Sequence, residues 1–290
     1  MAKLRNLAAC GCNRLQEASE LDEQEARIDT RLLLQAALGD VSHAWLIAHG
    51  DDSVQDGVRE RFEALLAERI AGRPIAHILG KREFFGREFQ VSPATLIPRA
   101  DTELLVEAAL ERMPLNERLQ VLDLGTGTGA IAITLGLERP QSEILALDFS
   151  EAALAIAEAN VQQLQARNVS LKHSHWYQAL LASGPVKQFD FIVSNPPYIE
   201  AADAHLQRGD LRFEPLSALA SGIDGLEDIR EIAAGAAAFL KPSGWLLLEH
   251  GYQQGPAVQA ILQQHGLQQI STLHDLEGHP RVTLGQLSAS

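Results

Sequence analysis

The sequence predicts an α/β protein in which a doubly wound, seven-stranded sheet follows a small helical region. From residue 119 onwards, short apolar segments alternate with longer amphipathic ones, which is the pattern of alternating strands and helices. Several of the short segments are apolar on both faces, as buried parallel strands are. The chain has 290 residues, and at roughly 150 residues per domain this length suggests about two domains.

The first 72 residues read as helices. Asp22 is a candidate N-cap, and Glu25 completes a capping box before apolar residues that recur every three or four positions. A second unit of this kind begins at Ser53 and stops at Gly72. These apolar stripes predict a helical domain over residues 1–73.

A change of pattern follows the helical region. Between Ile75 and Val91 the apolar runs are short and interrupted by two glycines, which favours a β-hairpin. We expect this hairpin to join the two domains across residues 74–92. Asp101 is then expected to cap the first helix of the larger domain, residues 93–290.

The larger domain should contain seven strands. The candidates are residues 120–124, 143–148, 169–173, 189–194, 244–250, 268–273 and 281–287. Helices are expected at residues 151–166, after a Ser150 cap, and at 226–240. Doubly wound sheets bind ligands at the carboxyl ends of their strands. Functional residues are therefore expected just after Leu124, Asp148, Ser194 and Leu248.

Charge and composition exclude several classes of function. The net charge is −14, of which residues 91–290 carry −11. Tight binding to a nucleic-acid backbone needs clustered Lys and Arg, so we expect no direct DNA binding. The longest apolar runs fall far short of the roughly 20 residues of a membrane span, and the N-terminus is unlike a signal peptide. Two cysteines, Cys10 and Cys12, form no disulfide framework, so a cytoplasmic protein is expected.

A glycine-rich turn follows the first strand of the larger domain. Gly125, Thr126, Gly127, Thr128 and Gly129 form it, and alternate glycines allow a tight turn and a close approach of the backbone to a nucleotide. The second strand ends at Asp148, whose carboxylate can accept hydrogen bonds from both hydroxyls of a ribose. The same glycines with Ala130 also fit a dinucleotide fingerprint, so this turn leaves the nucleoside open.

The fourth strand ends in Asn195-Pro196-Pro197-Tyr198. Two prolines in succession fix the direction in which the chain leaves the sheet. The side-chain oxygen of Asn195 and the carbonyl of Pro196 can then serve as two fixed acceptors for an NH₂ group, with Tyr198 packing over it. Holding both N–H bonds can direct the nitrogen lone pair toward an electrophile and stabilise developing positive charge.

At these residues the sequence resembles class I, Rossmann-like methyltransferases that use S-adenosylmethionine and methylate an NH₂ nitrogen. Further motifs resemble those of the HemK/PrmC family, which methylates glutamine in peptide chain release factors. They include Ile78-Leu79-Gly80, Phe84-Phe85-Gly86, Leu96-Ile97-Pro98-Arg99, Asp101-Thr102-Glu103, residues 210–216 and Glu249-His250-Gly251. Ala100 departs from the proline that the family commonly has after the arginine.

The resemblance implies roles for individual residues. The cofactor-binding residues would be Gly125, Thr126, Gly127, Thr128, Gly129, Asp148, Trp176 and Asn195. The acceptor glutamine would bind at Asn195, Pro196, Pro197 and Tyr198, with Asn195, Pro196 and Tyr198 acting in catalysis. Trp176 could equally belong to the core, Asp123 would orient the glycine turn or contact the cofactor, and Arg99 and Glu249 are further substrate-side candidates. His173 and His175 lack additional ligands, so no metal site is predicted.

The resemblance makes the substrate the Gly-Gly-Gln loop of bacterial class I release factors, with S-adenosylmethionine as cofactor and the helical domain helping to dock the partner. Three alternatives stay open. A ribosomal protein could supply the glutamine. An adenine-N6 methyltransferase of DNA or RNA uses a similar loop, although the acidic larger domain disfavours it. A non-catalytic docking module of the translation machinery is disfavoured by the intact motifs.

Overall fold

The computed structural model describes residues 3–18, 21–181 and 187–289. The chain divides into two compact units. The helical unit comprises Met1–Lys81 together with Arg208–Phe213, and the larger unit comprises Arg82–Gln207 and Glu214–Ser290. Among the described residues, no helix is both long enough and apolar enough to cross a membrane.

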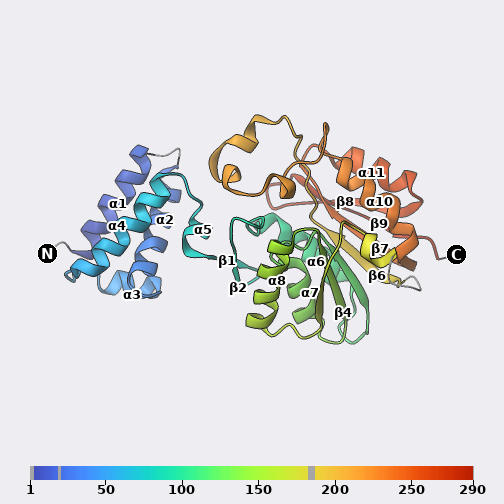
Figure 1. Cartoon of the computed structure of the whole chain (residues 1–290), viewed down its shortest axis with the longest axis horizontal. Coiled ribbons are helices and arrows are strands. Elements are labelled where there is room, and N and C mark those ends of the chain that lie inside the picture. Colours follow the sequence, from blue (N-terminus) through green and yellow to red (C-terminus); the bar gives the residue numbers. More distant parts are fainter. Residues whose placement is uncertain (1–2, 19–20, 182–186, 290) are drawn as a thin grey trace. The chain divides into compact units, whose positions relative to one another are not determined.

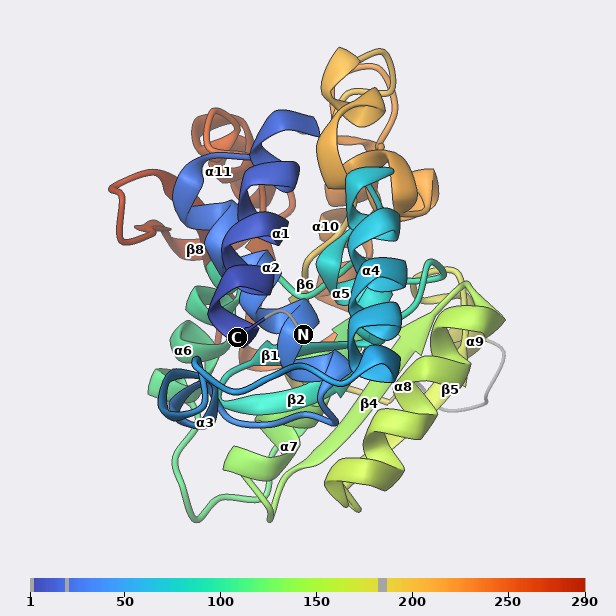
Figure 2. The ribbon, with the colours of Figure 1, turned by 90° about the vertical axis from the view of Figure 1, so that its left-hand side faces the viewer.

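The helical unit has the helices that its apolar stripes predict. Its helices are α1 (Leu4–Ala18), α2 (Glu23–Ala37), α3 (His43–Ala48), α4 (Asp56–Ile70) and α5 (Ile75–Leu79). Helices α1, α2 and α4 run side by side (Figure 2) and bury one apolar core that includes Leu15, Leu33 and Phe62. The capping box of Asp22 and Glu25 is present at the start of α2.

Two expectations for this unit are wrong. Ser53 does not cap α4, which begins at Asp56 after Gln55, because Ser53 instead pairs with Lys3 in an isolated β-bridge. Ile75–Leu79 is a short helix and not the first strand of the hairpin. Its apolar residues pack on the core of the helical unit, and Gly80 ends it with a φ of 70°.

The predicted β-hairpin is present but shorter than expected. Strands β1 (Lys81–Phe84) and β2 (Arg87–Gln90) form a two-stranded sheet. The two turn residues, Phe85 and Gly86, both have positive φ, which suits the tight turn of a twisted hairpin. The rings of Phe84 and Phe89 meet edge to face and join the core of the larger unit.

The larger unit is built on a seven-stranded sheet with the strand order β5-β4-β3-β6-β7-β9-β8. The pairs among β3 to β7 are parallel, and β9 is antiparallel to both of its neighbours. All seven expected strands are confirmed: β3 (Gln120–Leu124), β4 (Glu143–Asp148), β5 (Val169–His173), β6 (Phe189–Ser194), β7 (Leu240–Glu249), β8 (Leu267–His274) and β9 (Pro280–Leu287). The strand order reverses between β3 and β6, where a ligand site is expected.

Helices cover both faces of this sheet, as the alternating pattern predicts (Figure 1). One face carries α6 (Glu103–Arg112), α7 (Ala130–Glu138) and α8 (Glu151–Leu164), and the other carries α9 (Gln178–Leu181), α10 (Glu227–Phe239) and α11 (Gly255–Gln264). Short 3₁₀ helices of the larger unit lie at Ala100–Thr102, Ala204–Gln207 and Leu216–Ala218, and a further one, Gly209–Phe213, belongs to the helical unit. Ser150 caps α8 as expected, since its side chain accepts from the amide of Ala153.

Asp101 is not the cap of α6. It lies within the 3₁₀ turn Ala100–Thr102, and its carboxylate forms an ion pair with Arg281 at 3.0 Å. Helix α6 instead begins after Thr102, without a hydrogen bond from a capping side chain. The ion pair with Arg281, which is distant in the sequence, therefore takes the place of the helix cap that the local sequence predicts.

Candidate active site

A cavity of about 390 Å³ lies at the carboxyl edge of the sheet. Residues that follow β3, β4, β5 and β6 form its wall, together with the segment before α6. The wall includes Gly125, Thr126, Gly127, Thr128, Asp148, Trp176, Asn195 and Pro197. Of the other predicted residues, Arg99 also lines the cavity, whereas Gly129, Pro196 and Tyr198 lie outside its wall. The fold thus brings most predicted site residues to one place.

The glycine turn needs its glycines for backbone conformation. Gly125, Gly127 and Gly129 have φ values of 72°, 56° and 81°, all in the left-handed region that L side chains rarely adopt. At Gly129 a Cβ would also lie 2.8 Å from Cδ1 of Ile133. The amide of Gly125 donates to the carbonyl of Leu147 at 2.9 Å, which ties the turn to β4.

Asp148 is held by backbone amides at the end of β4. Its Oδ2 accepts from the amide of Gly127 and its Oδ1 from that of Ser150, both at 2.8 Å. Burial raises the pKa of Asp148, while these amide donors lower it. Each carboxylate oxygen retains a lone pair that can accept a hydroxyl of a bound nucleoside.

Asp123 lies beneath the glycine turn and is fully buried. The hydroxyl of Thr126 donates to its Oδ2 at 2.6 Å, whereas Oδ1 makes no hydrogen bond of normal geometry among the described residues. Burial raises the pKa of Asp123 to about 7. Because it is absent from the cavity wall, Asp123 supports the turn through Thr126.

Trp176 combines both of its expected environments. Its indole packs against the core under α9 and α10, and it also lines the cavity beside Gly125. The backbone at Trp176 has a φ of 41°, unusual for a bulky residue, and its indole N–H has no hydrogen-bond partner in the described part of the chain. The ring edge of Trp176, at Cζ3 and Cη2, lies beside Gly125 in the cavity wall, whereas the indole N–H is buried.

Asn195 stands directly after β6. The hydroxyl of Ser194 fixes the end of the strand by donating to the carbonyl of Leu124 at 2.6 Å. The side-chain Nδ2 of Asn195 donates to Oγ1 of Thr102 at 3.0 Å, which leaves its Oδ1 for an incoming donor. Thr102 also lines the cavity, and sequence reasoning had not assigned it a role.

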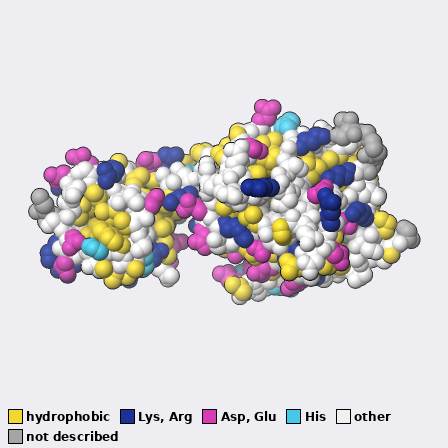
Figure 3. Space-filling model, turned by 90° about the horizontal axis from the view of Figure 1, so that it is seen from below, with side chains coloured by type: hydrophobic (Ala, Val, Ile, Leu, Met, Phe, Trp, Pro, Cys, Tyr) yellow, Lys and Arg dark blue, Asp and Glu magenta, His cyan; other side chains and the backbone are white. Residues whose placement is uncertain are grey.

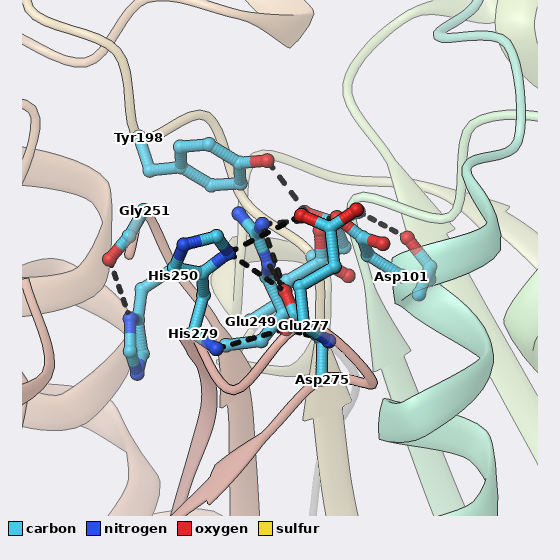
Figure 4. A network of polar contacts seen from close by, with 11 residues as sticks. Asp101, Tyr198, Glu249, His250, Gly251, Asp275, Glu277 and His279 are labelled. Atoms are coloured by element: carbon cyan, nitrogen blue, oxygen red, sulfur yellow. Dashed lines mark hydrogen bonds and ion pairs between the residues drawn. The ribbon is translucent and has the colours of Figure 1, made fainter. Parts of the chain in front are cut away.

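Tyr198 packs against the apolar core on the sheet face that α10 and α11 cover. Its amide donates to the carbonyl of Leu219 at 3.2 Å, and its carbonyl accepts from Gln254 at 2.9 Å. Its hydroxyl points toward Glu249 (Figure 4) and donates to Oε1 at 3.5 Å. Burial raises the pKa of the Tyr198 phenol, so it stays protonated at neutral pH.

Glu249 ends β7 and has 1% of its surface exposed. It lies outside the cavity wall, and its Oε2 makes no hydrogen bond of normal geometry among the described residues. Burial raises the pKa of Glu249 to about 7, although hydrogen bonding from Thr102 and the charge of Arg281 lower it. Arg281 itself pairs with Asp101 and with Asp275, at 3.0 and 3.1 Å.

Arg99 lines the cavity and is held there by an ion pair. Its guanidinium binds the carboxylate of Glu214, whose side chain is fully buried, and Glu214 also accepts from the amide of Ile97 at 2.9 Å. In the sequence, Glu214 stands out only as part of the motif over residues 210–216. The pairing orients Arg99, which lines the cavity.

His173 ends β5 and His175 follows that strand, and the two histidines have different partners. A ring nitrogen of His173 lies 2.7 Å from the carbonyl oxygen of Phe149, and His175 lies 3.4 Å from Glu231. Within residues 3–18, 21–181 and 187–289, no cluster of three or more potential metal ligands is present.

Two family models match the chain. The model of the methyltransferase small domain matches residues 100–210, and the model of the PrmC N-terminal domain matches residues 7–80. The chain is also similar to curated proteins named release factor glutamine methyltransferase. That of Xylella fastidiosa (strain Temecula1) is 49% identical over 91% of this chain and 94% of its own. The Pseudomonas aeruginosa protein is 48% identical, covering 95% and 98%, and the Escherichia coli K12 protein is 45% identical, covering 94% and 97%.

Solved structures support the fold. The 16S rRNA N2 G1207 methyltransferase of T. Thermophilus, in complex with AdoMet and guanosine, has a TM-score of 0.52 at 24% identity and covers 71% of this chain and 49% of that chain. A methyltransferase from Pyrococcus furiosus has a TM-score of 0.50 at 16% identity, covering 77% and 97%. At these identities the likeness shows a methyltransferase fold alone. Because curated relatives match more than nine-tenths of the chain at 45–49% identity, this chain belongs to the release factor glutamine methyltransferase family.

Proposed function

We propose that this protein transfers a methyl group from S-adenosylmethionine to the side-chain nitrogen, N5, of the glutamine in the Gly-Gly-Gln motif of bacterial class I release factors. The observation that carries the proposal is that one cavity wall contains both the glycine turn with Asp148 and the side chain of Asn195. Relatives named for this reaction over nearly their whole length support the choice of substrate. The proposed place of action is the cytoplasm.

The cavity fits S-adenosylmethionine in three respects. The left-handed glycines leave the turn without side chains, Asp148 retains lone pairs for ribose hydroxyls, and the ring of Trp176 gives the cavity wall an apolar face beside Gly125. When bound, S-adenosylmethionine supplies an electrophilic methyl group on a sulfonium. These residues are therefore proposed to hold the cofactor.

The acceptor half of the site is proposed to hold the glutamine amide. Oδ1 of Asn195 and the carbonyl of Pro196 accept the two N–H bonds, and the Pro-Pro pair fixes the distance between these acceptors. As the N–CH₃ bond forms, the S–CH₃ bond of the sulfonium would break and leave a neutral thioether. Positive charge that develops on the nitrogen is stabilised by the same two acceptors, and one amide proton then passes to water. Tyr198 supports this loop from behind through its contact with Glu249.

A labelling experiment tests the substrate. The protein is incubated with S-adenosylmethionine carrying a labelled methyl group and, separately, with release factor, ribosomal protein and DNA. We expect label on the release factor alone, and none after Gln→Ala replacement in its Gly-Gly-Gln motif. Label that survives this replacement would contradict the target, whereas label on ribosomal protein or DNA would support one of the two alternative methyltransferase activities.

Docking of the release factor is proposed for the helical unit. A hollow of about 860 Å³ lies between α1, α2 and α3, and Figure 3 shows apolar atoms gathered on this unit. Ile47, in the wall of the hollow, has 71% of its surface exposed. We expect Ile47→Asp to raise KM for whole release factor about tenfold, the loss of one buried aliphatic contact, without changing turnover of a short Gly-Gly-Gln peptide. An unchanged KM would contradict docking at this hollow.

A further inference from the structure

Thr102 stands between two side chains that lie on different strands. Nδ2 of Asn195, after β6, donates to its hydroxyl oxygen at 3.0 Å. On its other side is the carboxyl of Glu249 at the end of β7, where burial raises the pKa of Glu249 and hydrogen bonding from Thr102 opposes that rise. Thr102 and Asn195 line the cavity, whereas Glu249 lies behind them and is 1% exposed. The three residues form a connected series that ends at the cavity.

The number of protons gives this series a direction. A threonine hydroxyl has one proton to donate and two lone pairs with which to accept. Because Thr102 accepts from Asn195, its single proton is free to be donated toward Glu249. An ionised carboxylate only accepts hydrogen bonds, so it favours this direction and no other.

We propose that Glu249 and Thr102 are positioning residues for Asn195: ionised Glu249 orients the Thr102 hydroxyl, and Thr102 then holds the Asn195 amide with Oδ1 facing the acceptor glutamine. The proposal rests on the function proposed above, because Oδ1 must accept an N–H of the substrate amide. Neither residue needs to touch the substrate.

Protonation of Glu249 would remove the preference. A protonated carboxyl can donate to the Thr102 oxygen, and Thr102 can then donate to Oδ1 of Asn195. The asparagine amide would turn over and present its NH₂ group to the NH₂ group of the substrate. Two donors facing one another cannot form a hydrogen bond, so turnover should fall as Glu249 becomes protonated.

The charged and titratable groups around Glu249 set the pH of this change. Burial raises the pKa of Glu249 to about 7, Asp101 raises it, and Arg281 and the Tyr198 hydroxyl lower it. The neighbouring His250 points to other partners, the Gly251 carbonyl and the Thr283 hydroxyl. Beyond Arg281 lies the turn between β8 and β9, with the charged or titratable residues Asp275, Glu277 and His279 (Figure 4). The change is therefore expected near neutral pH.

We call the series Glu249, Thr102 and Asn195 the relay. Substitutions of Thr102 distinguish an effect of this relay from an effect of simple packing. Thr102→Val keeps the shape but removes the hydroxyl, and we expect kcat to fall about 10- to 100-fold because misorientation of a reacting pair costs this much. Thr102→Ser restores the hydroxyl and should recover most of the activity. Affinity for S-adenosylmethionine should stay within about twofold of wild type in both, since the cofactor half is untouched.

Thr134→Val is the matched control. Thr134 is a fully buried threonine on α7 whose hydroxyl has no hydrogen-bond partner among the described residues, and it lies outside the cavity wall. Thr134→Val removes a buried threonine hydroxyl, as Thr102→Val does, but this hydroxyl is not part of the relay. We expect its kcat and pH profile to match wild type.

A second readout does not depend on turnover. In ¹⁵N-labelled protein the side-chain NH₂ resonances of Asn195, assigned by their loss in Asn195→Ala, should shift with pH in wild type near the Glu249 pKa of about 7. The shift should disappear in Thr102→Val and in Glu249→Gln, and persist in Thr134→Val. The rise of kcat with pH through this range should disappear in the same two variants.

The outcomes distinguish this proposal from the proposed function. If wild type transfers no methyl group to release factor, the function fails. If wild type is active but Thr102→Val matches it at every pH, or Thr102→Ser is no better than Thr102→Val, the relay is overturned. Should Thr102→Val fail to fold, Glu249→Gln provides the test. If Glu249→Gln keeps the wild-type pH profile of kcat and the wild-type pH-dependent shift of the Asn195 NH₂ resonances, the relay is overturned.

Discussion

Two buried carboxyls lie beneath the two halves of the site, Asp123 under the glycine turn and Glu249 under the acceptor loop. Both have at most 1% of their surface exposed, and burial raises the pKa of each to about 7. Each also has one oxygen without a hydrogen bond of normal geometry in the described part of the chain. In burial and in proton affinity the two groups are alike.

Their partners differ. Asp123 is held by Thr126, three residues further on, so the support of the cofactor half lies within one short motif. Glu249 faces Tyr198, Thr102 and Arg281, which come from three separate parts of the chain. The cofactor half is therefore built locally, and the acceptor half is assembled by tertiary structure. Changes at the two halves should affect different steps.

The largest effect is expected at Asn195. Asn195→Ala removes one of the two acceptors for the substrate amide, and we expect kcat to fall about 100- to 1,000-fold, as when one preorganised hydrogen-bonding group is lost from an active site. Cofactor affinity, measured by calorimetry, should change little because Asp148 and the glycine turn are intact. Near-normal turnover would refute the role of Asn195 as an acceptor for the substrate amide.

A change at Asp148 should do the reverse. Asp148→Asn weakens its hydrogen bonds to ribose hydroxyls, and we expect cofactor affinity to fall about 10- to 100-fold, the equivalent of one or two charge-assisted bonds. At saturating cofactor, kcat should stay within a few-fold of wild type. A large loss of kcat with unchanged affinity would contradict the assignment of Asp148 to the cofactor half.

The two carboxyls should affect stability in the same direction. Their pKa values in the folded protein, about 7, lie above the reference values of 3.8 for Asp123 and 4.5 for Glu249. Each therefore contributes stability that is complete below its reference pKa and is lost as pH rises through about 7. We expect Asp123→Asn and Glu249→Gln each to remove on the order of 1–2 kcal/mol of the fall in unfolding free energy between pH 4 and 8, because relaxation and water penetration reduce the effect of burial.

Denaturant unfolding at several pH values measures this slope. Glu138→Gln, at a partly exposed carboxylate that pairs with Arg87, is a control that should leave the slope nearly unchanged. An increase of stability with pH in wild type that vanishes in either neutral variant would contradict the sign.

The smallest effect is expected at the Tyr198 hydroxyl. Its contact with Glu249 is 3.5 Å long, at the limit of a hydrogen bond. Tyr198→Phe should therefore lower kcat by about threefold or less, corresponding to less than about 1 kcal/mol. Tyr177→Phe is the control: its hydroxyl donates to the carbonyl of Ile232 at 2.9 Å, so it should lose about 1 kcal/mol of stability without loss of turnover.

Local patterns predicted the sheet well and the helix starts less well. The seven strands followed from apolar runs because parallel strands buried on both faces need them. Ile75–Leu79 was misassigned because a short apolar run has no clear period and its partner core is elsewhere. Asp101 has the sequence of a cap, but Arg281 attracts its carboxylate into an ion pair 180 positions away in the chain.

The sequence by itself determined the succession of strands and helices along the chain, the glycine turn, Asp148 and the Asn-Pro-Pro-Tyr exit loop. Each of these depends on residues that are close in sequence. Tertiary structure decided that Thr102 holds Asn195 and that Glu249 lies behind it. It also decided that Trp176 lines the cavity while packing on the core. The physical reason is that hydrogen bonds and burial depend on position in space, and only the folded sheet brings the ends of β6 and β7 beside the segment before α6.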